Sequence, residues 1–182
     1  MDIVFILITL LGFFFLAVIL GGLFLPASWV LEKAVLVNAR PKTLFPLLNE
    51  LEKWGEWTVW TAEEDFSWSY PGLTTGEGAV QVWESSRING HLTITKSVPH
   101  QTLEYKFEIN EGKLVVLGTL VLAAADPDYT QVAWRCQLVP LTDNNPIRRY
   151  QAYFLKNYFD TAMESSLAAL PALFSSEESA LD

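Results

Sequence analysis

The sequence predicts an α+β protein in which a curved antiparallel sheet wraps around a long C-terminal helix, preceded by one N-terminal transmembrane helix. Three observations predict this fold class. The first 25 residues are almost entirely apolar, residues 78–139 alternate apolar and polar side chains, and residues 146–170 have helical periodicity. A curved sheet must cover its apolar face, and the C-terminal helix is the only large element that can do so.

The N-terminal segment from Ile3 to Leu25 is the strongest single signal in the chain. Its 23 residues carry no charge, and Thr9 is the only polar one. At about 1.5 Å per residue, the segment is long enough for a hydrocarbon core of about 30 Å. A cleaved signal peptide is the alternative, but it needs a positive charge before a shorter apolar run, and here Asp2 precedes the run. We expect residues 1–28 to be a retained anchor that contacts the lipid bilayer through residues 3–25.

Basic residues near the apolar segment predict how the chain is oriented. Lys33, Arg40 and Lys42 follow the segment, and no basic side chain precedes it. The positive-inside rule then predicts a single-pass membrane protein whose domain lies in the cytoplasm. Trp29, just past the segment, suits the headgroup zone as an aromatic anchor, and it could equally pack on the domain.

Charge and residue types exclude several classes of function. A formal net charge of −9 argues against a nucleic-acid partner and against a polybasic grip on anionic lipid. The chain has one cysteine, Cys136, and two histidines without ligand spacing, so the sequence predicts no metal site. No glycine-rich nucleotide-binding motif is present, and we expect no cofactor.

The predicted domain covers residues 29–174, and residues 175–182 form an acidic tail expected to be disordered. The domain begins with a strand at residues 31–38 and a short helix that starts at Pro41. Five strands in an antiparallel meander follow, at residues 79–88, 91–98, 102–109, 113–124 and 130–139.

Two glycines in the meander suggest local features. Asn89-Gly90 is the strongest two-residue hairpin signal, because both positions of such a turn take positive φ. Gly118 interrupts a strand that is apolar on both faces, and it suggests a bulge.

The C-terminal helix is predicted from its start signal and its apolar stripe. Asn145 suits the N-cap and Pro146 the first helical position. Pro171 near the end limits how far the helix continues. The predicted stripe consists of Ile147, Tyr150, Phe154, Tyr158, Ala162 and Leu170.

Several short motifs have the spacing of a known family. They are "LP..W" at Leu25, Pro26 and Trp29, "W..W" at Trp54 and Trp57, "G.GA...W" at Gly76, Gly78, Ala79 and Trp83, then Gly90, Trp134 and "ESSLAAL" at residues 164–170. With these residues the chain resembles the helix-grip fold of the START-like superfamily, and within it the membrane-anchored relatives of the polyketide cyclase/dehydrase (SRPBCC) family. Ser165-Ser166 departs from that pattern, where a glycine is expected. The resemblance implies a cavity between the sheet and the long helix that often holds an apolar ligand.

Aromatic residues on elements that face one another form the candidate ligand cavity. They are Trp57, Trp83, Tyr105, Phe107, Trp134, Tyr150, Phe154 and Tyr158. Core packing is the alternative interpretation of each. Glu84 would be an acid or base if it faced the cavity, and a solvated carboxylate if it did not. Arg148 and Arg149 lie in the first helical turn, where the helix dipole disfavours cations. This suggests either a nearby anionic partner or lipid headgroup, or two solvated side chains that pair with Asp143 or the acidic surface.

The leading hypothesis is a membrane-anchored domain that binds an apolar small molecule or lipid in this cavity, with no residue assigned to catalysis. One alternative is a polyketide cyclase/dehydrase-like enzyme, which the resemblance alone implies. The other is a non-enzymatic interaction or assembly factor whose cavity is filled. In the segment "EKWGEWTVW", we expect Trp54 and Trp57 to pack a corner between short helices and the sheet, and Trp60 to be exposed.

Overall fold

The computed structural model describes residues 3–59, 66–86 and 88–175. Its elements are α1 (Ile3–Phe24), β1 (Val30–Val37), α2 (Pro41–Asn49), the 3-10 helix η1 (Leu51–Glu56), β2 (Ser67–Ser69), β3 (Val80–Glu84), β4 (Asn89–Val98), β5 (Thr102–Ile109), β6 (Leu114–Asp126), β7 (Tyr129–Leu138) and α3 (Pro146–Ser175). Trp60 and residues 176–182 lie outside the described residues.

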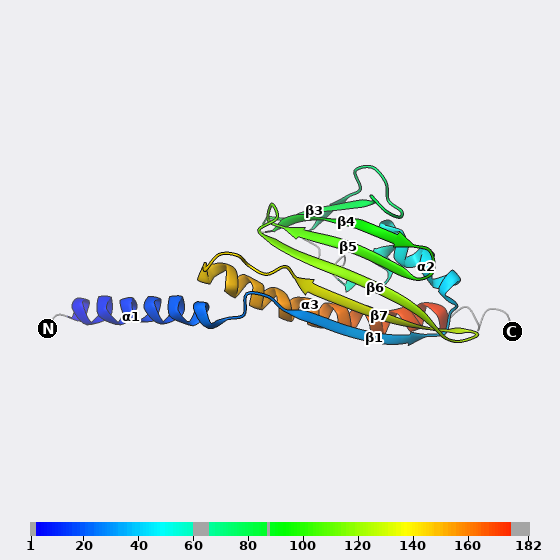
Figure 1. Cartoon of the computed structure of the whole chain (residues 1–182). Coiled ribbons are helices and arrows are strands. Elements are labelled where there is room, and N and C mark those ends of the chain that lie inside the picture. The colour runs from blue at the N-terminus through cyan, green and yellow to red at the C-terminus, as the bar shows by residue number, and fades with distance from the viewer. Residues whose placement is uncertain (1–2, 60–65, 87, 176–182) are drawn as a thin grey trace.

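The strands form a single antiparallel sheet that curves around α3 (Figure 1). The order across the seven strands is β1-β7-β6-β5-β4-β3-β2, so the last strand, β7, closes against the first, β1. In β5, each apolar residue is buried and each polar neighbour is partly exposed, as expected when one strand face covers a core. The predicted α+β fold, with a curved sheet wrapped around a long C-terminal helix, is confirmed.

The anchor candidate α1 projects from one end of the domain (Figure 1). It is the one described helix that is long and apolar enough to cross a membrane. Trp29, just after it, packs on the domain: its Nε1 donates to the carbonyl of Ala152 at 2.9 Å, and its ring contacts Phe159. This contact favours the packing interpretation of Trp29 over the headgroup one.

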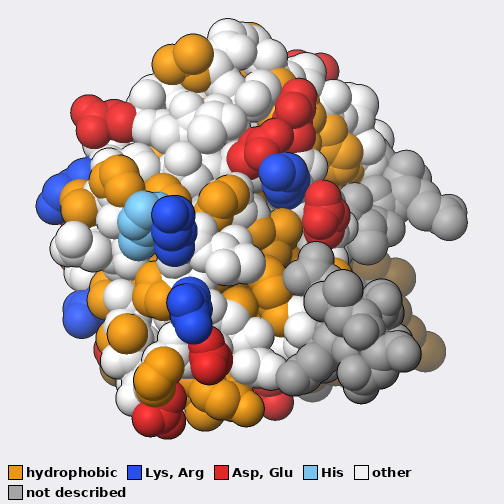
Figure 2. Space-filling model, turned by 90° about the vertical axis from the view of Figure 1, so that its right-hand side faces the viewer, with side chains coloured by type: hydrophobic (Ala, Val, Ile, Leu, Met, Phe, Trp, Pro, Cys, Tyr) orange, Lys and Arg blue, Asp and Glu red, His pale blue; other side chains and the backbone are white. Residues whose placement is uncertain are grey.

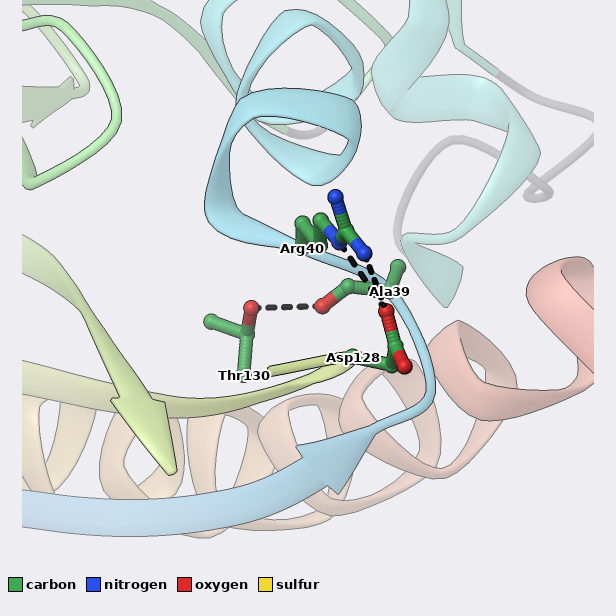
Figure 3. Close-up of polar contacts among 4 residues, drawn as sticks. All are labelled: Ala39, Arg40, Asp128 and Thr130. Atoms are coloured by element: carbon green, nitrogen blue, oxygen red, sulfur yellow. Dashed lines mark hydrogen bonds and ion pairs between the residues drawn. The ribbon is translucent and has the colours of Figure 1, made fainter. Parts of the chain in front are cut away.

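At the other end of the domain, short polar contacts connect the loops. Thr130 Oγ1 donates to the carbonyl of Ala39 at 2.6 Å, and the Arg40 guanidinium holds the Asp128 carboxylate at 2.8 Å (Figure 3). These contacts join the start of α2 to the β6–β7 turn. Figure 2 shows the surface of this end, where side chains of both charge signs are interspersed with apolar ones.

The hairpin expected at Asn89-Gly90 lies elsewhere. Both residues belong to β4, and the connection from β3 lies before them, where the Ser85 amide donates to the Ile88 carbonyl at 2.9 Å. Gly90 is required for another reason: a Cβ there would collide with the indole of Trp83. The prediction was therefore wrong about the turn.

Gly118 has a similar explanation. The β5–β6 register runs through it without a shift, so the predicted bulge is absent at this position. A Cβ on Gly118 would collide with the ring of Tyr105, which lies across it. Both glycines thus leave room for an aromatic ring on a neighbouring strand.

Three further features differ from the sequence prediction. The short edge strand β2 was not predicted, because three residues are too few for a periodic signal. The helix α3 continues through Pro171 to Ser175, since a proline in the last turns removes few backbone hydrogen bonds. Its buried stripe also differs: Ile147 and Phe154 are exposed, and the buried positions are Ala152, Phe159, Ala162, Met163, Ser166, Leu167 and Leu170.

Candidate functional site

A cavity of about 490 Å³ lies between the N-terminal half of α3 and the sheet. Its size falls in the range of about 300–1,000 Å³ that is typical of small-molecule sites. It is lined by Phe66, Trp68, Trp83, Ile88, Phe107, Ile109, Asn110, Leu114, Gln151, Phe154, Leu155, Tyr158 and Phe159. The residues come from α3, from β2 and the residue before it, from β3, β5 and β6, and from the β3–β4 and β5–β6 turns. These elements meet at the end of the domain from which α1 projects (Figure 1).

Stacked aromatic rings form the inner wall of the cavity. Trp83 stacks on Phe107 with ring centroids 4.2 Å apart, and Phe107 meets Phe159 of α3 edge to face at 5.5 Å. Both sheet residues are nine-tenths or more buried and lie on the concave face. Because Gly90 has no side chain, Trp83 can lie flat along the sheet and leave the space in front of it open.

Exposed aromatic side chains surround the mouth of the cavity. Phe154 is 65% exposed and Tyr158 is 40% exposed, although both line the cavity. On the opposite side, Phe66 and Trp68 pack together with centroids 5.8 Å apart. The mouth therefore presents apolar surface to whatever lies outside it.

The polar groups of the lining are few and uncharged. Among the described residues they are the amides of Asn110 and Gln151, the hydroxyl of Tyr158 and the indole N–H groups of Trp68 and Trp83. Asn110 has φ of 51°, and its Oδ1 accepts from the amide of Asn89 at 3.4 Å. The described lining contributes no carboxylate, imidazole or amine. It can hold apolar surface and accept or donate a few hydrogen bonds.

The other half of the space between sheet and helix is filled. We call this the filled half and define it by Trp54, Trp57, Tyr105 and Trp134. Each of these side chains is at most 2% exposed, and their rings contact one another at centroid distances of 5.3 to 5.4 Å. The half that contains the cavity is the open half.

Hydrogen bonds hold the filled half together. Trp54 Nε1 donates to the Leu48 carbonyl at 2.8 Å, and Trp134 Nε1 donates to the Tyr105 hydroxyl at 2.8 Å. Ser166 Oγ accepts from the amide of Val59 at 3.1 Å. The serine that departs from the family pattern thus ties the chain after η1 to α3.

Burial keeps the polar side chains of the filled half uncharged. Burial raises the pKa of Tyr105 well above its ordinary value, and it raises the pKa of the Cys136 thiol to about 12. The two groups lie 3.4 Å apart. A thiol with so high a pKa is a poor nucleophile, so this pair has the properties of packed core and not of a reactive site.

Half of the predicted cavity residues line the cavity, namely Trp83, Phe107, Phe154 and Tyr158. The structure places Trp57, Tyr105 and Trp134 in the filled half. Tyr150 contacts α1, where its hydroxyl donates to the Val18 carbonyl at 3.0 Å.

Glu84 lies at the exposed end of β3, on the opposite face of the strand from Trp83. Glu84 is therefore not part of the cavity lining, which agrees with the interpretation that its carboxylate is solvated. Trp54 and Trp57 do pack the corner between the short helices and the sheet, as expected.

Sequence reasoning missed several lining residues. Leu155 and Phe159 are four residues apart on α3, and Gln151 continues the same row. The predicted row of 150, 154 and 158 lies one residue to the side, a rotation of about 100° around the helix. Ile88 and Leu114 flank the two turns, where alternation no longer indicates which face is inside. Ile109 continues the buried alternation of β5, which could have identified it.

A curved antiparallel sheet, a long helix across it and an apolar cavity between them define a helix-grip domain. Residues 28–175 match the family model described as "Polyketide cyclase / dehydrase and lipid transport". The chain belongs to this family. No curated protein sequence matches it.

Solved structures support the fold. A hypothetical protein, jhp0584, from Helicobacter pylori superposes with a TM-score of 0.58 at 12% identity, covering 80% of this chain and 88% of that one. Ara h 8.0201 gives 0.55 at 17% identity, with coverage of 82% and 99%. A protein from Rhodobacter sphaeroides gives 0.55 at 18% identity, with coverage of 81% and 92%. At such low identities the likeness concerns the fold alone.

Proposed function

We propose that the protein is a membrane-anchored binding protein for an uncharged apolar small molecule or lipid. The observation that carries the proposal is the cavity of about 490 Å³ whose described lining is apolar except for two amides, one phenol and two indole N–H groups. Burying apolar ligand surface is favourable by about 25 cal/mol per Å², and the few polar groups orient the ligand. The lipid-transport part of the family description is consistent with such a ligand.

The proposed charge of the ligand follows from the lining. An anionic ligand buried in this cavity would need a cation beside it, because an unpaired buried charge is costly. The described lining residues supply no charged group. The ligand class that fits is therefore neutral, with an alcohol, ester or carbonyl group within reach of Asn110 or Gln151.

We propose that α1 anchors the protein in the membrane. Its apolar side chains from Ile3 to Phe24 are exposed to the outside of the domain, as a helix in lipid requires. We propose that residues 1–28 are the anchor and that the domain faces the cytoplasm, as Lys33, Arg40 and Lys42 favour.

Binding is tested with the full chain in lipid nanodiscs and a pyrene-labelled fatty alcohol as probe. Energy transfer from tryptophan to pyrene reports the bound probe. The variant Leu155→Trp places an indole at a half-buried position of the cavity lining. It should weaken probe binding about tenfold or more, which corresponds to about 1.4 kcal/mol. The matched control is Tyr153→Trp, which adds the same donor at an exposed position outside the lining.

The outcome depends on the difference between the two variants. Equal dissociation constants for Leu155→Trp and Tyr153→Trp would show that the probe binds outside the cavity. The pyrene-labelled fatty acid of the same length should bind more weakly than the alcohol at neutral pH. Preference for the acid would contradict the proposed ligand charge.

A further inference from the structure

The last two turns of α1 are joined to the first turns of α3 by hydrogen bonds. One nitrogen of the Arg149 guanidinium donates to the carbonyls of Leu23 and Leu25, at 2.8 and 2.7 Å. These are among the carbonyls that the end of a helix leaves without partners, and a cation there also complements the helix dipole. One turn of α1 earlier, the Val18 carbonyl accepts from Tyr150. Arg149 thus binds the end of α1, which explains a cation in the first turn of α3.

Two glycines make this junction close. A Cβ on Gly22 would lie 2.6 Å from Cβ of Pro146 and 2.9 Å from the ring of Tyr150, and a Cβ on Gly21 would lie 3.0 Å from the Tyr150 hydroxyl. Only glycine allows α3 to approach the anchor so closely. Gly12, in the middle of α1, has nothing within 4 Å of the same position.

The junction fixes the depth of α3 relative to a bilayer. Val18 precedes the end of α1 at Phe24 by about 9 Å along the helix axis, at about 1.5 Å per residue. When the 22 residues of α1 span the hydrocarbon core, Pro146, which lies against Gly22, is near the boundary of that core, and the Tyr150 hydroxyl reaches several Å inside it. The N-terminal half of α3 then begins at the membrane surface.

The side chains exposed on this half of α3 suit that position. Ile147 is 67% exposed, Tyr153 43%, Phe154 65% and Tyr158 40%. Aromatic residues are enriched at the membrane interface because their rings tolerate both apolar and polar surroundings. Phe154 and Tyr158 also line the cavity mouth, which lies at the α1 end of the domain (Figure 1).

The cations of the junction already have partners within the chain. Arg148 pairs with Asp143 at 2.7 Å, and Arg149 binds the α1 carbonyls and the Asn144 side chain. The surface that remains at the mouth is apolar and aromatic. An aromatic surface of this kind suits the membrane interface rather than a polybasic contact with anionic headgroups.

We infer that the α1–α3 junction holds the cavity mouth against the bilayer, so that the cavity exchanges its ligand directly with the membrane. This inference rests on the proposed binding function. It adds the source of the ligand, which is the lipid phase on the side of the membrane that holds the domain, and the surface through which the ligand passes.

Contact with the bilayer is tested with nitroxide labels on the full chain in phosphatidylcholine vesicles. The native Cys136 is fully buried with a raised pKa and does not compete for the label. The test position is Phe154→Cys, and the control is Ala168→Cys, an exposed position in the C-terminal half of the same helix. The label at 154 should be relaxed more by oxygen, which concentrates in lipid, and the label at 168 more by an aqueous nickel chelate.

Exchange is tested through the junction glycines. Vesicles that contain the full chain are mixed with donor vesicles carrying the pyrene-labelled fatty alcohol, and energy transfer is followed over time. The variant Gly22→Leu separates α3 from α1 and should slow loading by about threefold or more, because a tether without fixed geometry positions a site less well. The control Gly12→Leu should load at the rate of the unchanged chain.

The final occupancy separates the two proposals. If the unchanged chain and both variants reach the same occupancy and only Gly22→Leu is slow, membrane exchange is supported. If all three proteins reach that occupancy at the same rate, the inference of membrane exchange is overturned and the binding proposal stands. The same holds if the nickel chelate relaxes the label at 154 as strongly as the label at 168. If the unchanged chain takes up no probe, the binding function itself fails.

Discussion

The two halves of the space between sheet and α3 differ in what covers them. In the filled half, η1 inserts Trp54 into the core, and Trp57 follows directly after it. In the open half, no described short helix inserts a ring between the sheet and α3, and the inner wall is formed by the stacked rings of Trp83 and Phe107. The same pair of elements thus makes a solid core where short helices insert rings, and a binding cavity where they do not.

The difference lies in the loops and not in the sheet. Both halves use a glycine under an aromatic ring, Gly118 under Tyr105 and Gly90 under Trp83. Tyr105 is then covered by Trp54, with centroids 5.3 Å apart, whereas Trp83 faces the cavity. A helix-grip domain can therefore adjust its cavity through the segment between its first two strands while the sheet stays the same.

The largest expected effect is on the stability of the filled half. The variant Trp54→Ala removes a fully buried indole and should lower the free energy of unfolding by about 3–5 kcal/mol. Trp83→Ala should cost clearly less, because one face of that ring already borders empty space. Urea unfolding of the full chain in detergent micelles, followed by circular dichroism, measures both. Equal losses would mean that the open half is packed as tightly as the filled half.

Overpacking should distinguish a densely packed position on α3 from a cavity-facing one by a smaller amount. On α3, Ala152 is fully buried against Trp29, whereas Leu155, one turn later, faces the cavity. We expect Ala152→Leu to destabilise the protein by about 1–3 kcal/mol, because a dense core has no room for added methyl groups. The cavity-filling variant Leu155→Trp should change stability by less than about 1 kcal/mol.

Thermal unfolding of the two variants under one set of conditions tests this difference. An added side chain that is tolerated at Ala152 would show that α3 can shift away from the sheet. A large loss at Leu155 would show that the cavity is too small for an indole and would weaken the case for a ligand of that size.

A third effect concerns the glycine in the filled half. In Gly118→Ala the new methyl group meets the ring of Tyr105, which Trp54 and Trp134 hold in place. The expected loss is about 1–3 kcal/mol. In a Tyr105→Leu background the same change should cost less, and a double-mutant cycle measures the coupling. Strictly additive losses would exclude the ring as the cause.

Much of the fold could be predicted from the sequence. The alternation in residues 102–109 and 130–139 placed two strands and their buried faces correctly, because one face of each covers the core. The turn at Asn89-Gly90 could not be placed, since a glycine looks the same in a turn as under a tryptophan. Only the neighbouring strand decides which role Gly90 has.

The candidate site was harder to predict from the sequence than the fold. Aromatic residues that fill a core and those that line a cavity have the same residue types and the same periodicity, so Trp134 and Trp83 cannot be told apart before packing is known. The row of α3 that faces the cavity depends on how the helix is rotated. Contact with α1 uses Tyr150, which no pattern within α3 reveals.

The smallest expected effect is on the outer face of the open half. Glu108 lies between the cavity residues Phe107 and Ile109 and points away from them, within 2.7 Å of Lys106 and 2.9 Å of His91. The hydrogen bond from Lys106 is the largest cause that holds the pKa of Glu108 below its ordinary value of 4.5. The stabilisation is therefore present above pH 4.5 and is lost as the pH falls through the lowered pKa. Exposed ion pairs contribute at most about 1 kcal/mol, so the loss in acid should be small.

The variant Glu108→Gln isolates this contribution, because the amide cannot titrate. Its stability relative to the unchanged chain should be lowest at neutral pH, and the two should converge as the pH falls below 4.5. Urea unfolding at several pH values measures the difference. If the cavity wall depends on the ion pair outside it, probe binding should weaken over the same pH range in the unchanged chain only. If binding is constant while stability falls, the wall is held by the packing of Trp83, Phe107 and Phe159 alone, and the two faces of the sheet act independently.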